Sequence, residues 1–84
     1  MRNTNIANLF RSIPTGDSML AYNIGEGLDS ESPDSDYARD AFEWLDSFLD
    51  NLKGDLHSEA WTEMNRLSNF VDFDDLDLIL NGSD

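Results

Sequence analysis

Residues 37–52 carry apolar side chains at the spacing that one face of an α-helix requires. These residues are Tyr37, Ala41, Phe42, Leu45, Phe48, Leu49 and Leu52. Steps of three and four residues place them on one side of a helix, and that side must be buried against other elements. Ser32 or Ser35 can cap the start of this helix, and Gly54, directly after Lys53, can end it.

Two other segments repeat the helical spacing, one near the start of the chain and one in its second half. The first can be capped by Asn3 or Thr4 and ends before Pro14. Its apolar face consists of Ile6, Leu9, Phe10 and Ile13. The second begins at Asp55 or Ser58. Its apolar residues are Ala60, Trp61, Met64, Leu67 and Val71.

The segment between the first helix and the long one has a weaker pattern. Asp17 can cap a short element, but over residues 17–28 the spacing does not distinguish a helical turn from a short strand. Gly25 is a possible stop for this element. From residue 25 to residue 35 the composition shifts to Gly, Ser, Asp, Glu and Pro, which predicts a mobile acidic loop.

Residues 71–80 alternate acidic and bulky apolar side chains, and this pattern has two interpretations. In the first, Asp72 caps a last helix that packs on the core of the domain and ends at Asn81 and Gly82. The core face of that helix would be Phe73, Leu76, Ile79 and Leu80. In the second, the segment is an acidic recruitment peptide that folds in the groove of a partner. We favour the core helix, for which Phe73→Ala should cost about 3–5 kcal/mol of stability.

These segments together predict an all-α protein with four or five short helices. A chain of 84 residues has room for one core, so we expect a single small domain spanning residues 1–84. Mutual repulsion of its charges opposes folding. Nine aromatic residues and eleven leucines, arranged with a helical period, nevertheless favour a folded chain.

Acidic residues outnumber basic ones by 18 to 5, which gives a formal charge of −13 at pH 7. Phosphate groups would repel such a chain, so direct contact with nucleic acid or with an anionic membrane is disfavoured. No apolar run is long enough to span a membrane and no leader peptide is visible, which favours the cytoplasm. The chain has no cysteine, so it offers no disulfide, thiol nucleophile or thiolate metal ligand.

The single histidine and the acidic segments predict neither an enzyme nor a metalloprotein. His57 has Ser58 and Asp55 as close neighbours in sequence, whereas a catalytic triad gathers its members from separate segments. The acidic segments that begin at Asp29 and Asp72 both lack the glycine that an EF-hand needs at its sixth position. We therefore expect no catalytic residue, no metal ligand and no cofactor.

The arrangement of the carboxylates is the strongest functional signal. On the long predicted helix they follow one face, where neighbours stand about 5–6 Å apart. Two base-pair steps along one DNA strand advance about 6.8 Å, so the row resembles a line of phosphates. Lys53 is the only lysine in the chain, whereas solvated helix faces usually interleave lysines with acids. We expect a partner to be bound by Asp36, Asp40, Glu43, Asp46, Asp50, Glu59, Glu63, Asp72, Asp74, Asp75 and Asp77.

The small size, the acidity, the absence of cysteine and the helical pattern together resemble the small acidic inhibitors made by phages and mobile elements. Anti-CRISPR and anti-restriction proteins belong to this class, and many of them are nucleic-acid mimics. The resemblance is to a class and has no family motif, so it assigns no residue. It implies a stoichiometric inhibitor that blocks the basic DNA- or RNA-binding site of a host nuclease or its surveillance complex. Such a protein would act in the host cytoplasm.

Other interpretations remain open from the sequence. An immunity protein or antitoxin would use a local acidic patch against a basic toxin. A recruitment protein would bind through the apolar residues of segment 71–80. A high-salt habitat would also favour a chain rich in aspartate and poor in lysine.

Overall fold

The chain is described by a computed structural model for residues 4–13 and 16–81. Within these residues it forms five α-helices and one short 3-10 helix, and the prediction of an all-α protein is confirmed. The elements are α1 (Asn5–Ser12), α2 (Ser18–Asp29), α3 (Ser35–Phe48), η1 (Leu49–Asn51), α4 (Asp55–Ser68) and α5 (Phe73–Asn81). The expected helix boundaries at Asn3, Pro14 and Gly82 lie outside the described residues.

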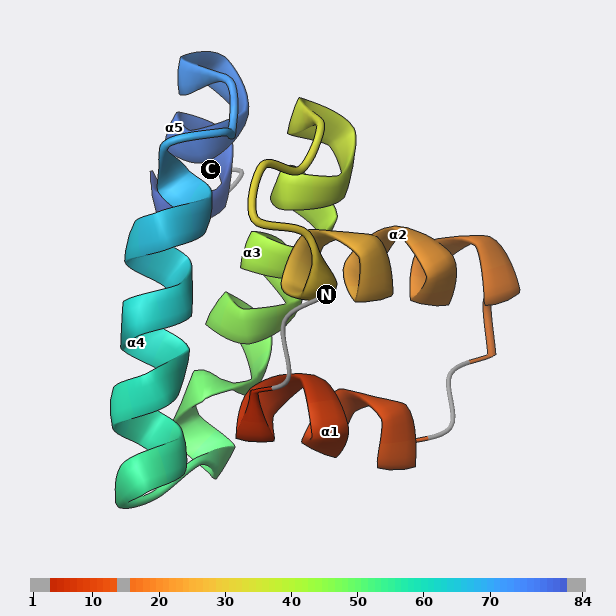
Figure 1. Cartoon of the computed structure of the whole chain (residues 1–84). Coiled ribbons are helices and arrows are strands. Elements are labelled where there is room, and N and C mark those ends of the chain that lie inside the picture. Colours follow the sequence, from red (N-terminus) through yellow and green to blue (C-terminus); the bar gives the residue numbers. More distant parts are fainter. Residues whose placement is uncertain (1–3, 14–15, 82–84) are drawn as a thin grey trace.

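Helix α3 lies at the centre of the molecule, with α2 on one side and α4 on the other (Figure 1). Helix α1 packs against α2 and α4, and α5 lies against α3 near the end of α4 (Figure 1). The apolar stripes expected from the sequence meet between these helices. Among the buried residues are Ile6, Phe10, Ile24, Leu28, Phe42, Leu45, Met64 and Leu67.

Two helix caps are formed as expected, and the segment that follows α1 is more helical than expected. The side chain of Thr4 accepts a hydrogen bond from the backbone N–H of Ala7 at 3.0 Å, and Asp17 caps α2 in the same manner. Helix α2 then continues through Gly25 to Asp29, so the prediction of a loop over residues 25–35 is wrong at both ends. Only residues 30–34 separate α2 from α3.

The connection from α3 to α4 also differs from the sequence prediction. The long helix stops at Phe48 and tightens into η1, so Leu52 lies beyond it but is still buried. Gly54 has a φ of 62°, as a helix-ending glycine would, but its ψ of −134° is not that of a left-handed helix terminus. It is the N-cap residue of α4, which begins at Asp55, one of the two predicted starts.

Glycine at position 27 allows α2 and α3 to approach closely. A Cβ atom at Gly27 would lie 2.5 Å from the carbonyl oxygen of Tyr37 and 2.7 Å from Cβ of Ala41. Ala38 and Ala41, on the facing side of α3, are both fully buried. Small residues on both helices therefore set the distance between α2 and α3, and backbone atoms leave no room for adjustment.

Gly27→Ala should lower the free energy of unfolding by about 1–3 kcal/mol, because the added methyl group forces the two helices apart. Urea denaturation followed by circular dichroism measures this change. Gly25→Ala is the matched control in the same helix, since its Cβ would meet only Phe10 Cε2 at 3.9 Å. That control should gain up to about 1 kcal/mol from helix propensity. If Gly27→Ala and Gly25→Ala changed the free energy of unfolding equally, this would contradict the close approach of α2 and α3 at Gly27.

Candidate partner-binding surface

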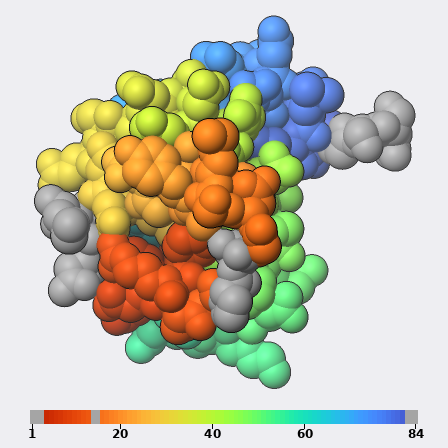
Figure 2. Space-filling model, turned by 90° about the vertical axis from the view of Figure 1, so that its right-hand side faces the viewer, coloured from red at the N-terminus to blue at the C-terminus, as the bar shows by residue number. Residues whose placement is uncertain are grey.

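Helix α3 and η1 carry five of the eleven carboxylates expected to bind a partner. Helix α3 turns Ala38, Ala41, Phe42 and Leu45 into the core, so the opposite side of the helix faces solvent. We define the α3 acidic face as Asp36, Asp40, Glu43, Asp46 and Asp50. All of these except Asp40 are exposed. Figure 2 shows that the green part of the chain, which includes much of this face, borders orange α2 and blue α5.

Arg39 interrupts the α3 acidic face and connects it to α5. Its Nε lies 3.3 Å from Asp40 Oδ1, and its Nη1 lies 3.7 Å from Asp36 Oδ1 and 3.9 Å from Asp75 Oδ2. Partial burial lowers the pKa of Arg39, but the hydrogen bond to Asp40 and the charges of Asp40, Asp36 and Asp75 outweigh burial and raise it. Three of the expected contact residues therefore share one guanidinium.

Asp40 is held within the fold and does not extend the row of exposed carboxylates. Its side chain is 12% exposed, and its Oδ2 accepts a hydrogen bond of 2.9 Å from Asn23 Nδ2 of α2. The row of carboxylates expected on one face of this helix is thus broken between Asp36 and Glu43. The sequence pattern missed this because the contact depends on where α2 packs.

The exposed carboxylates farther along α3 and η1 have no cation beside them in the described part of the chain. Among residues 4–13 and 16–81, the ion pairs to carboxylates are made by Arg11, Arg39 and Arg66. None of these pairs involves Glu43, Asp46, Asp50, Asp72, Asp74 or Asp77. All six side chains are exposed, so α3, η1, α5 and Asp72 just before α5 carry negative charge that no ion pair of the described residues compensates.

The two carboxylates of α4 that were expected to bind a partner, Glu59 and Glu63, have roles inside the fold. Glu59 Oε1 accepts a hydrogen bond of 2.9 Å from the backbone N–H of Ile6, and it thereby satisfies an N-terminal amide of α1. Glu63 is 1% exposed, and its Oε1 lies 3.2 Å from Arg66 Nη2. Glu63 cannot meet a partner while the domain is folded, so its assignment to the binding surface is corrected. The spacing of Glu63 and Arg66, three residues apart on a helix, was a signal for this pair.

Arg66 also holds the end of α2. Its Nη1 donates to the carbonyl oxygen of Ser30 at 2.7 Å, and its Nη2 donates to that of Gly27 at 2.9 Å. These carbonyls lie at the C-terminal end of α2, where the helix has no further amides to satisfy them and where its dipole is negative. Arg66 therefore attaches α4 to α2 through hydrogen bonds and through charge.

Arg66→Gln should lower the free energy of unfolding by about 3–5 kcal/mol, as expected when one partner of a buried ion pair is removed. Thermal and urea denaturation measure the loss. Lys53→Gln is the control, because it removes the same charge from an exposed residue that makes no ion pair with the described carboxylates. A loss at position 66 no larger than at position 53 would show that total charge, and not this contact, sets stability.

Helix α5 packs on the core through only part of its apolar face. Leu76 and Ile79 pack against the core as predicted. Phe73 is 81% exposed and Leu80 is 58% exposed, so the prediction that these two residues are buried is wrong. Leu78, on another side of the helix, is 62% exposed. The last helix thus combines exposed apolar side chains with exposed carboxylates.

Phe73→Ala should change the free energy of unfolding by no more than about 0.5 kcal/mol, because little of the side chain is buried in the fold. Leu76→Ala, one turn further along the same helix, should cost about 1–2 kcal/mol for a partly buried leucine. Chemical denaturation of the two variants compares them directly. A larger cost at Phe73 than at Leu76 would contradict the observed packing of α5.

Within residues 4–13 and 16–81, no group of three or more histidine, aspartate or glutamate side chains is placed to hold a metal ion. In the same residues, no helix combines the length and apolar character needed to cross a membrane. Comparison with protein families, with curated proteins and with solved structures found no match to this chain.

Proposed function

We propose that the protein is a stoichiometric inhibitor that performs no chemistry and occupies a basic nucleic-acid-binding site of a host defence nuclease or its surveillance complex. The observation that carries this proposal is the surface of uncompensated carboxylates on α3, η1 and α5. Arg11, Arg39 and Arg66 are engaged in pairs with carboxylates of the domain itself. The exposed negative charge is therefore available to the lysines and arginines of a partner.

The physical role of this surface would be collective. A single exposed ion pair contributes about 0.2–1 kcal/mol, so tight binding requires several pairs at once. Complementary charge also speeds encounter with the partner and makes binding sensitive to salt. The residues proposed for this contact are the uncompensated Glu43, Asp46, Asp50, Asp72, Asp74 and Asp77, together with Asp36, which is exposed but also lies 3.7 Å from Arg39. If the protein is encoded by a phage, the site of action would be the host cytoplasm.

Neutralising three carboxylates of the α3 acidic face should weaken partner binding by about tenfold or more. The variant is Glu43→Gln, Asp46→Asn and Asp50→Asn, and it should remain folded because these side chains are exposed. Binding is measured by capture from a lysate of the host and by elution in a salt gradient. The elution should shift to lower salt, and the captured protein should be released by DNA or RNA.

The matched control changes the same number of charges at residues outside the proposed contact set. Glu31→Gln, Asp34→Asn and Asp55→Asn neutralise exposed carboxylates that make no ion pair in the described chain. This control variant should shift the salt concentration of elution much less than the triple variant on α3 and η1. The inhibitor proposal fails if both variants behave alike, or if nucleic acid and this protein occupy the captured partner together.

One observation favours a second function, an acidic recruitment protein that binds a partner through the apolar residues of its last helix. Phe73, Leu78 and Leu80 are exposed on one short helix, and exposed aromatic residues often dominate protein interfaces. In that case Phe73→Ala would greatly weaken capture, whereas the salt dependence would be shallow. The same capture assay therefore separates the two functions.

A further inference from the structure

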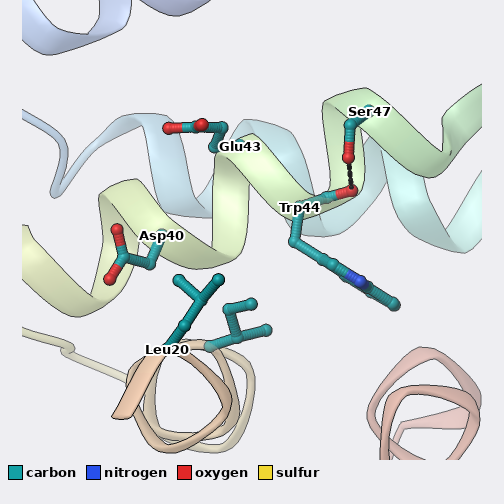
Figure 3. A pocket seen from close by; sticks show the side chains of 6 residues that line it. Leu20, Asp40, Glu43, Trp44 and Ser47 are labelled. Atoms are coloured by element: carbon teal, nitrogen blue, oxygen red, sulfur yellow. Dashed lines mark hydrogen bonds between the residues drawn. The ribbon is translucent and has the colours of Figure 1, made fainter. Parts of the chain in front are cut away.

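A pocket of about 190 Å³ opens between α2 and α3, beside the α3 acidic face. Its lining residues are Leu20, Ile24, Asp40, Glu43, Trp44 and Ser47. Figure 3 shows Leu20 opposite α3, with Asp40 to one side of it and Trp44 to the other. Ser47 is turned back toward its own helix, where its hydroxyl donates to the carbonyl oxygen of Trp44 at 2.9 Å.

The packing of the helices holds the walls of this pocket in place. The indole of Trp44 stacks on Phe48 with ring centroids 5.4 Å apart and meets Phe10 edge-on at 5.0 Å. Ile24 is buried in the core. The carboxylate of Asp40 is held by Asn23 and Arg39. Trp44, Ile24 and Asp40 are therefore a preformed part of the site, which lowers the entropic cost of binding.

The lining has two chemical parts. Leu20, Ile24 and Trp44 offer apolar and aromatic surface. Glu43 supplies negative charge next to it that is unpaired within the described residues, whereas the carboxylate of Asp40 is shared with Asn23 and Arg39. Long cationic side chains match this combination, because their methylene groups lie along apolar surface while the charged end meets carboxylates. A guanidinium suits the site better than an ammonium, since it is planar, weakly hydrated and able to stack on an aromatic ring.

We propose that the pocket between α2 and α3 receives an arginine side chain from the basic partner. This inference rests on the proposed function and gives it a specific anchor, in contrast to a contact made by surface charge alone. The aliphatic part of the arginine lies between Leu20 and Trp44, and its guanidinium binds Glu43 with Asp40 nearby. The arginine does not come from a second copy of this chain, because two molecules of formal charge −13 repel each other.

The test uses a probe that carries only the proposed group. Trp61 is 47% exposed and lies outside the pocket lining, so Trp61→Phe leaves Trp44 as the single tryptophan reporter. Acetyl-arginine amide is titrated into this protein, and the indole N–H signal of Trp44 is followed by NMR. We expect a saturable shift. Acetyl-citrulline amide has nearly the same shape without the charge, and it should bind at least about tenfold more weakly.

Two variants of equal charge change test the position of the site. Glu43→Gln removes a pocket carboxylate and should weaken binding of acetyl-arginine amide about fivefold. Asp46→Asn, on the same helix but outside the pocket lining, should change it by less than about twofold, since exposed charges are screened by solvent and salt. Both residues are exposed, so both variants should fold.

Three results would overturn the arginine pocket: no shift of Trp44, equal binding of the citrulline probe, or equal loss in the two variants. These results leave the inhibitor proposal standing if the triple variant Glu43→Gln, Asp46→Asn and Asp50→Asn still loses its partner in the capture assay. Conversely, an arginine pocket that behaves as expected, together with capture insensitive to the α3 carboxylates, would refute the inhibitor proposal alone.

Discussion

The arrangement of the helices depends on the guanidinium of Arg66. It bonds the carbonyl oxygens of Gly27 and Ser30 at the end of α2 while pairing with buried Glu63 on its own helix. Each of these groups would be costly to bury alone, because desolvation penalises carbonyls and carboxylates that lack a donor. Arg66 thus allows α4 to close against the end of α2, and α2 in turn packs along α3.

Arg11, Arg39 and Arg66 form ion pairs within the fold, and this explains why the outer surface is strongly negative. With so few cations in the chain, those that join helices leave little positive charge to balance the exposed carboxylates. Arg39 is the intermediate case, because it joins α3 to α5 and also neutralises part of the acidic face. The remaining repulsion destabilises the free protein and would be relieved by a positively charged partner. The same exposed carboxylates therefore lower the stability of the free protein and would bind the partner.

The surface that results has more than one kind of chemistry. Uncompensated carboxylates of η1 and α5 are suited to many modest contacts with a basic groove. The pocket beside Trp44 and the exposed ring of Phe73 offer shape and apolar area in addition. An electrostatic surface with local apolar anchors can combine fast encounter with selection of one partner.

The sequence by itself determined the all-α class, the Asp17 cap and the excess of negative charge, and it narrowed the first cap to Asn3 or Thr4 and the start of α4 to Asp55 or Ser58. These features follow from local spacing, from the capping chemistry of single residues and from composition. The extent of α2 was not predictable, because the sequence pattern indicates a stop at Gly25, whereas the packing of α2 against α3 at Gly27 continues the helix to Asp29. The exposure of Phe73 was likewise undecided, since periodicity locates an apolar face without saying how much of it a neighbour covers.

Only the tertiary structure decided which carboxylates remain outside. Asp40, Glu59 and Glu63 have the same charge as Glu43 and Asp46, and nothing in composition distinguishes them. The first three meet Asn23, the N–H of Ile6 and Arg66, and all but the last of these donors lie on other helices. A carboxylate is buried where packing brings a hydrogen-bond donor to it, and elsewhere it remains in solvent. The reason is that a charge can be buried at low cost only when it is hydrogen-bonded or paired.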